Sequence, residues 1–519
     1  MKRKFIILVL LSIRCIPLSA QNVNTSDTIV PAKGNENKQL EKIKQKKIEE
    51  HSDSTGSEPK KQMVDTTIQN KYGDLLNDDT AFNKRYPLII PIAETFGCNL
   101  VTFGVDRYIF KFDYSTGVNI NSWKHNLKTG WEWDTDRFGI NFIGHPYSGT
   151  LTFNSARSNG YNYWQSFPFA AGGSLMWEYF GETTLPSYND IITTPVNGAF
   201  LGEILYRISS NILDDRARGG QRFFREFAAA VIDPVRGVNR LLQGKSFRTT
   251  NKEVYQKEPL NITFYGGVQK IHNPDDRIKV NTNTATVYLQ LDYGNPFENR
   301  TRKPFDFFKL RVDFNVGAGR KILDNITGYG ILAGKNFQAD SGHRAMLIGL
   351  YQYYDYWDNT TFELGTIGLG GGIITKLSLD NATKSNLYTS LHIVCVPFAG
   401  NSTRFGPDTS AFRDYNFGGG LQGKFETSVN FSKWATAALV ASYSWIHSYV
   451  GLKEDNFLTI LKPRATVRIV KNLDFGYEQA IYLNNIHSPG LDNVQSTRTE
   501  QKLFLMLYLE DKQRRGHYN

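Results

Sequence analysis

The segment FFKLRVDFNVG, residues 307–317, alternates apolar and polar side chains from residue 308 onward. One side carries Phe308, Leu310, Val312, Phe314 and Val316, and the other carries Lys309, Arg311, Asp313 and Asn315. A period of two is typical of a β-strand that lies between two unlike environments. The segment therefore predicts a strand with one face in an apolar medium and the other in a polar one.

The segment FGGGLQGKFETSVNF, residues 417–431, repeats this alternation over a longer span. A tilted strand needs roughly 9–11 residues to cross a hydrocarbon layer, and strands of soluble sandwiches are usually shorter. Similar segments predict about twelve strands, an even number as in single-chain bacterial barrels, at 259–269, 284–294, 306–317, 324–335, 343–356, 362–377, 385–396, 415–431, 434–447, 458–470, 472–484 and 500–510.

The first twenty residues follow the pattern of a secretory signal peptide. A basic start (Lys2, Arg3, Lys4) precedes an apolar stretch, and the small residues Ser19 and Ala20 precede Gln21. We therefore expect residues 1–20 to be removed and the chain to be exported.

Beyond the signal, the sequence has no apolar run of about 18 residues free of charges, so it predicts no ordinary membrane helix. Backbone groups in lipid must pair within the protein, and a closed barrel achieves this. The mean hydropathy of −0.39, the 45 glycines and the 13% aromatic content fit such a barrel. The predicted fold is a mainly β protein, an antiparallel transmembrane β-barrel of about twelve strands with an α-helical N-terminal domain, located in the outer membrane. Its expected partners are outer-membrane lipids and the barrel-assembly machinery.

Charge and cysteine content exclude some classes of protein. The formal net charge is +10, and part of it belongs to the signal peptide, so we expect no nucleic-acid partner. After the signal only Cys98 and Cys395 remain, too few for a disulfide framework, and we expect two buried thiols. We expect no cofactor.

The chain divides into segments of different composition. Residues 21–84 are rich in Lys, Glu, Asn, Ser and Thr, which predicts a disordered periplasmic linker; the alternative is a docking segment that folds on an envelope partner. Residues 85–248 predict a helical domain that plugs or caps the periplasmic mouth, with helices within 86–112, 195–213 and 220–231. In the second of these, Gly198 and Gly202 form a small-xxx-small face that allows close approach. Residues 257–510 form the barrel, and 511–519 a polar tail.

Residues 123–245 carry motifs such as WEWDTDRFGINFIGHPYSG, SARSNGYNYW and LPSYNDIITTPVNGAFLGE. The pattern resembles a domain-of-unknown-function family of Gram-negative outer-membrane and envelope proteins. The resemblance rests on Trp133, Asp134, Asp136, Asn141, His145, Pro146, Gly149, Ala156, Arg157, Ser158, Gly160, Trp177, Glu178, Glu182, Pro186, Ser187, Asp190, Thr194, Pro195, Gly198 and Glu203. It implies no activity, because the family has none assigned.

Candidate catalytic residues surround His145, the one histidine inside the quoted motifs. His145, with Asp134, Asp136 and Ser148, is a candidate site for Ser/His/acid acyl transfer. The alternative is a His145 that only hydrogen-bonds in a polar core or caps a turn. Metal binding by Asp134, Asp136 and His145 is a further alternative, because carboxylates and imidazole are suitable ligands, although we expect no metal.

Two other sets of charged residues are candidates for binding. The first lies in the helical region: Arg157, Glu178, Glu182, Asp190, Glu203 and Arg207. Within it we expect Glu178 and Glu182 to pair with Arg157, Arg207, Arg222 or Arg225 in a buried ion network. The second faces the lumen of the predicted barrel: Lys309, Arg311, Lys462, Arg464 and Arg468. These charges either select ions or anionic solutes or pair across a narrow lumen and fill it.

Three classes of function remain. The first is a structural or interaction role in the cell envelope. The second is a gated conduit for a small or amphipathic solute, and the third is a lipid-acting hydrolase or acyltransferase that uses His145. The sequence leaves open whether the protein is an enzyme.

Overall fold

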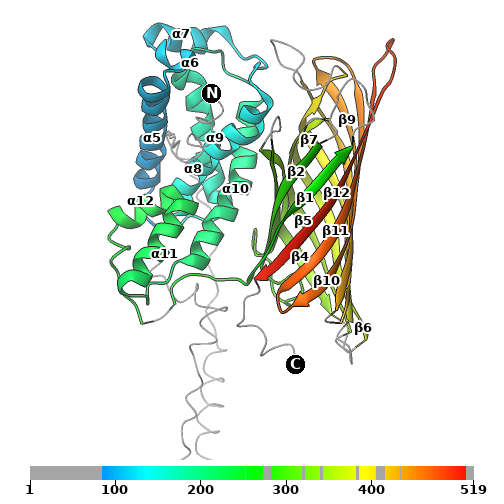
Figure 1. The fold of residues 1–519 in the computed structure, drawn as a ribbon. Coiled ribbons are helices and arrows are strands. Elements are labelled where there is room, and N and C mark those ends of the chain that lie inside the picture. Colours follow the sequence, from blue (N-terminus) through cyan, green and yellow to red (C-terminus); the bar gives the residue numbers. More distant parts are fainter. Residues whose placement is uncertain are drawn as a thin grey trace, which may run out of the picture.

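The computed structural model has two parts, a helical domain followed by a β-barrel (Figure 1). It describes residues 85–509 apart from residues 252, 273–281, 318–321, 339–342, 360, 381–384, 405–414 and 433. The predicted signal peptide, linker and polar C-terminal tail lie outside the described residues.

Twelve antiparallel strands form a closed barrel in which each strand pairs with its sequence neighbours and β1 pairs with β12. The prediction of a twelve-stranded barrel is confirmed. The strands are β1 (Leu260–His272), β2 (Thr282–Tyr293), β3 (Phe308–Val316), β4 (Leu323–Gln338), β5 (Arg344–Asp358), β6 (Glu363–Asp380), β7 (Ser385–Ser402), β8 (Tyr415–Phe431), β9 (Ala435–Val450), β10 (Asp455–Val470), β11 (Leu473–His487) and β12 (Val494–Leu509).

Side chains alternate across the barrel wall as the sequence predicts. On β12, Leu503, Leu505 and Leu507 are exposed on the outer wall, whereas Phe504 and Met506 between them are buried in the interior. The outer wall of this part of the barrel is therefore apolar.

The helical domain contains α5 (Ile89–Gly104), η1 (Val105–Phe110), α6 (Asp113–Thr116), α7 (Ile120–Thr129), η2 (Ile140–Gly144), α8 (His145–Arg157), α9 (Tyr163–Met176), η3 (Trp177–Gly181), α10 (Asp190–Ile212), α11 (Gly219–Ile232) and α12 (Pro234–Leu242); the η segments are π-helical. The predicted helix at 195–213 begins five residues earlier, at Asp190, so Pro195 lies inside α10 rather than in its first turn. Of the described helices, none combines the length and the apolar character that a membrane crossing requires.

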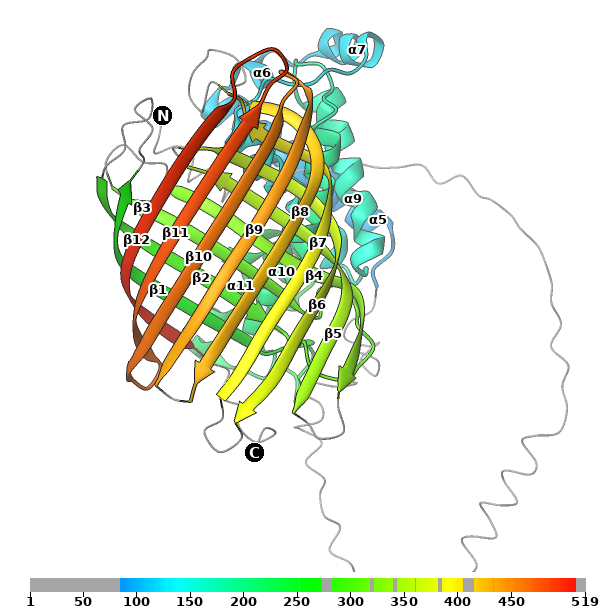
Figure 2. The same cartoon turned by 90° about the vertical axis from the view of Figure 1, so that its right-hand side faces the viewer.

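The helical domain stands beside the barrel, against its outer wall (Figures 1 and 2). Tyr163 donates a hydrogen bond to Gln352 of β5 (2.6 Å), and Gln352 donates to the carbonyl of Val196 in α10 (2.8 Å). The hydroxyl of Tyr354 donates to the carbonyl of Phe142. The expectation of a plug or cap at the barrel mouth is therefore wrong in placement, because the apolar residues of these helices find their partners on the outer wall.

Glycines in the barrel wall make room for this contact. A Cβ atom on Gly365 or Gly400 would lie 2.3 or 2.4 Å from the ring of Phe142. The apolar residues on the outer face of β3 predict contact with an apolar medium. The helices cover part of this face, because Phe308 and Leu310 are buried in one cluster with Phe142 and Phe200. In this region helices replace lipid as the apolar medium.

Paired charges and aromatic rings fill the barrel interior. Each predicted lumen charge has a partner, in the pairs Lys309–Glu426 (2.9 Å), Arg311–Glu426 (2.6 Å), Lys462–Asp313 (3.6 Å), Arg464–Glu478 (2.6 Å) and Arg468–Asp474 (2.8 Å). Several of these pairs join strands on different sides of the barrel, such as β3 and β8.

The two cysteines differ in exposure. Both are free; Cys98 is buried, but Cys395 is exposed on β7. The expectation of two buried thiols holds for Cys98 only, because Cys395 lies on the outer face of the barrel, where its neighbours Leu391 and Ile393 are also exposed.

Candidate functional site

Two loop segments meet at one end of the helical domain. Glu132 and Ser187 form an isolated parallel bridge, in which the amide of Glu132 donates to Pro186 (2.9 Å) and the amide of Tyr188 donates to Glu132 (2.9 Å). This bridge places Asp134 beside the first turn of α10. Trp133 packs against Phe417 of the barrel with ring centroids 5.2 Å apart, which anchors the same segment to the outer wall.

A close helix crossing brings α8 to the same place. A Cβ atom on Gly149 would lie 1.9 Å from the carbonyl oxygen of Thr194, and one on Gly198 would lie 2.5 Å from the carbonyl carbon of Gly149. The predicted small-xxx-small face of α10 is therefore used, because only glycine allows this approach. The crossing holds His145, the first residue of α8, beside Asp190, the first residue of α10.

Two residues of the site lie in or directly after π-helical segments. His145 directly follows η2, and Glu178 lies in η3. Such segments are rare and occur often at functional sites, because they reorient side chains within a helix.

The imidazole of His145 lies at the centre of a group of carboxylates. Its Nε2 atom is 3.4 Å from Oδ1 of Asp190 and 3.8 Å from Oδ2 of Asp136. One potential ligand atom each from Asp134, Asp136 and His145 lies within 4.8 Å of the others. We call Asp134, Asp136, His145 and Asp190 the acidic cluster.

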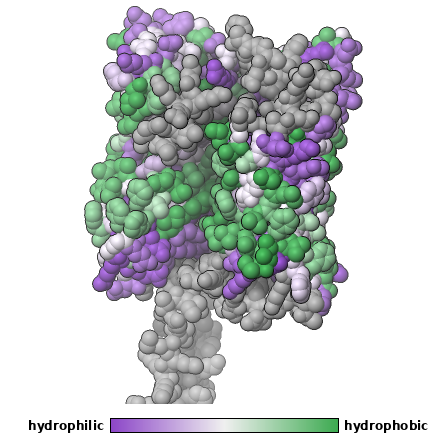
Figure 3. Space-filling view, in the orientation of Figure 1, coloured by the Kyte–Doolittle hydropathy of each residue, from purple (hydrophilic) through white to green (hydrophobic). Residues whose placement is uncertain are grey.

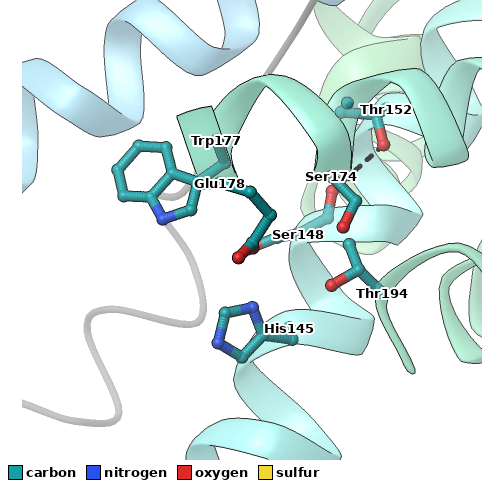
Figure 4. A pocket seen from close by; sticks show the side chains of 8 residues that line it. His145, Ser148, Thr152, Ser174, Trp177, Glu178 and Thr194 are labelled. Atoms are coloured by element: carbon teal, nitrogen blue, oxygen red, sulfur yellow. Dashed lines mark hydrogen bonds between the residues drawn. The ribbon is translucent and has the colours of Figure 1, made fainter. Parts of the chain in front are cut away.

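The acidic cluster borders a small pocket that His145 shares with Glu178 and Thr194 (Figure 4). In this view the carboxylate of Glu178 and the hydroxyl of Thr194 point toward the same space as the imidazole. The Thr194 hydroxyl is buried and forms no hydrogen bond with a described residue. The pocket is partly open to solvent and leaves about 10 Å³ for the centre of a water molecule, which is room for about one water and far less than a drug-sized molecule needs.

Negative charge accumulates at this end of the domain. The carboxylates of Glu178 and Asp190 are both buried here. Ser187 donates a hydrogen bond to Asp190 from its hydroxyl and one to Glu178 from its amide (2.7 Å), and Asn141 donates to Asp134 (2.9 Å). The side chain of Asp136 is half exposed, at 50%, so the cluster is open to water on one side.

This arrangement suits a divalent cation. Imidazole and carboxylate ligands together are typical of Zn²⁺ and Mn²⁺ sites. A cation would also neutralise buried carboxylates, which otherwise repel one another. Among the predicted residues, Asp134, Asp136 and His145 do converge, and Asp190 joins them.

Ser148 lines the pocket, as expected of a residue near His145, and it is buried. Within the described part of the chain, no hydrogen bond joins Ser148 to His145. The pair therefore lacks the nucleophile–base contact that characterises an activated serine.

The other predicted binding residues lie elsewhere. Glu203 pairs with Arg157 (2.6 Å) and Arg207 (2.8 Å) in the interior of the helical domain. Glu203 lies thirteen positions after Asp190 on α10, about 20 Å along the axis. Glu178 accepts from the amide of Ser187 (2.7 Å) and Glu182 accepts from the indole of Trp177 (3.1 Å), whereas Arg157 and Arg207 are engaged by Glu203.

Two contributors to the site were not predicted from the sequence. Asn189 accepts from the amide of Asp134 (3.2 Å), and Ser174 lines the pocket. The sequence could have indicated Asn189 as a site residue, because it directly precedes the first residue of α10. Nothing in the sequence around Ser174 distinguishes Ser174 from other serines.

Residues 130–235 match the family described as "Domain of unknown function (DUF3943)", which confirms the resemblance seen in the sequence. The matched residues contain the whole acidic cluster and the pocket. No curated protein shows significant sequence similarity to the chain.

Solved structures similar to about half of the chain are outer-membrane channels. The NanC porin is 7% identical over 48% of this chain and 99% of its own, with a TM-score of 0.26. The KdgM porin is 9% identical over 48% and 98%, with a TM-score of 0.22. The toluene transporter TodX of Pseudomonas putida is 9% identical over 49% and 90%, with a TM-score of 0.22. Such values say nothing about the function of this chain.

Proposed function

We propose that the protein is an outer-membrane barrel protein whose helical domain binds a divalent cation at the acidic cluster. The observation that carries this proposal is the convergence of Asp134, Asp136 and His145 within 4.8 Å, together with Asp190 at 3.4 Å from the imidazole. In this proposal the barrel anchors the domain in the outer membrane, and the role of the protein in the envelope depends on the cation site.

The part of the barrel wall that the helices leave bare supports an outer-membrane location. Exposed residues on neighbouring strands are large and apolar, for example Leu505 on β12, Phe475 on β11 and Val467 on β10. A closed sheet with such a wall satisfies its backbone groups internally and exposes apolar side chains to acyl chains. Outer-membrane lipids are then its natural partners.

Calorimetric titration of the purified full-length protein tests the cation site. After treatment with a chelator, the wild type is titrated with ZnCl₂ or MnCl₂ in detergent. We expect one strong site, lost in His145→Ala and in Asp134→Asn. Asp113→Asn is the matched control, because Asp113 is exposed on α6. Equal binding by all variants, or none by the wild type, contradicts the proposal.

Hydrolysis of an envelope lipid is a second candidate, favoured by the position of His145 both in the acidic cluster and in the wall of the pocket. A bound cation activates water at neutral pH, and that water would cleave an ester into an acid and an alcohol. Turnover of phospholipid or lipid A in mixed micelles tests this: His145→Ala must abolish it, and unchanged turnover removes this candidate.

A further inference from the structure

The outer surface of the helical domain is unusual for a domain in water. The exposed faces of α5, α11 and α12 carry mainly large apolar side chains: Ile89, Phe96, Leu100, Val101, Phe223, Phe224, Phe227, Val231, Val238, Leu241 and Leu242. Phe224 is 69% exposed and Leu242 78%. We call this set the apolar helical face.

The charged residues of α5 and α11 point inward. Glu94 of α5 accepts hydrogen bonds from Asn159 (2.5 Å) and Asn239 (2.7 Å). On α11, Arg225 donates to the carbonyl of Ile212 (2.7 Å), and Arg222 pairs with Glu226 (3.2 Å).

The charged residues of α12 also point inward. Arg236 donates to the carbonyl of Tyr206 (2.7 Å), and Arg240 pairs with Glu226 (2.7 Å). A helix at a water-exposed surface shows the reverse pattern, with charges outside and apolar residues inside. Charges that face the bundle interior and pair there are the pattern of helices in lipid.

The apolar helical face continues the apolar wall of the barrel. In Figure 3 hydrophobic residues cover the middle of both parts, and hydrophilic residues lie at the two ends of the helical domain. The two parts stand side by side in Figure 1, and in the turned view of Figure 2 the barrel lies in front of the helices. With 23 residues, α10 is about 35 Å long, comparable with a hydrocarbon layer of roughly 30 Å. It is too polar to cross lipid alone, but its charged residues Glu203 and Arg207 are buried and pair with each other (2.8 Å).

We propose that the helical domain lies in the same lipid layer as the barrel, with acyl chains covering the apolar helical face. The occupant is lipid because one continuous apolar surface joins this face to the wall of the barrel. This inference does not depend on cation binding, and the polar end with α7 would project from the lipid.

Spin labels on single cysteines test the proposal in the full-length protein, reconstituted in phosphatidylcholine nanodiscs. The native thiols are removed by Cys98→Ala and Cys395→Ala. Labels at Phe227→Cys and Leu241→Cys probe the apolar helical face; Leu505→Cys on the barrel wall is the lipid reference, and Lys124→Cys on α7 is the water reference. Collision rates with oxygen, which partitions into lipid, and with a water-soluble nickel chelate are compared.

We expect the labels at 227 and 241 to match the reference at 505, with frequent oxygen and rare nickel collisions. Values equal to those at 124 would place the face in water and overturn the proposal. Rare collisions with both reagents, with spin–spin broadening between labels, would show a second copy on this face and would also overturn it. Unchanged circular dichroism of each labelled variant shows that the fold is kept.

Discussion

The Nε2 atom of His145 and the Oδ1 atom of Asp190 lie 3.4 Å apart and join the first residues of α8 and α10. The same Oδ1 accepts no hydrogen bond from a described residue. A buried carboxylate oxygen without a hydrogen bond costs free energy, and this cost is offset if a cation binds there. The contact therefore links the stability of the helical domain to occupation of the site.

Asp190→Asn should remove the stabilisation that a cation gives to the protein. A ligand present at 100 times its Kd stabilises the folded state by about 2.7 kcal/mol, so ZnCl₂ or MnCl₂ should raise the Tm of the wild type. In Asp190→Asn this rise should shrink strongly, because one carboxylate ligand is lost. Thermal unfolding followed by circular dichroism at 222 nm checks it; an equal rise in both proteins would show that Asp190 does not contact the cation.

Gly198→Val should separate α8 from α10. Its Cβ would lie 2.5 Å from the backbone of Gly149, which cannot move without shifting α8. Overpacking of this kind costs about 1–3 kcal/mol, and the shift should also weaken cation binding, because His145 moves with α8. Gly97→Ala is the control: nothing lies within 4 Å of its Cβ, and alanine favours a helix by about 1 kcal/mol. Denaturant unfolding measures the first effect and calorimetry the second.

Glu203→Gln should destabilise the helical domain without changing cation affinity. Glu203 is fully buried and neutralises Arg157 and Arg207. Removal of one member of a buried ion network costs about 3–5 kcal/mol, because it leaves uncompensated charge. Asp492→Asn, at an exposed position between β11 and β12, is the matched control and should be neutral. Loss of cation binding in a folded Glu203→Gln protein would show that the two regions are coupled.

The barrel could be predicted from the sequence because a strand between unlike media leaves a period of two, as in Phe308 to Val316. The placement of the helices could not, because an apolar residue such as Phe142 has the same signature whether it packs on Gly365 of the outer wall or inside a lumen. The cluster around His145 was predicted in part, since Asp134 and Asp136 are near it in sequence. The inclusion of Asp190 depends on the Gly149–Gly198 crossing, which only the folded chain reveals.

The wild-type barrel should not conduct ions in planar bilayers, because paired side chains fill its interior. Arg311 on β3 and Glu426 on β8 reach each other across the barrel at 2.6 Å. Replacing both by alanine removes this bridge and should produce discrete conductance steps. Lys309, which also pairs with Glu426, keeps Asp292 (3.8 Å) as a partner. The control removes Arg468 and Asp474, which pair between the adjacent strands β10 and β11, and should remain closed. Steps of similar size in the wild type would show that the interior is already open and would support a conduit.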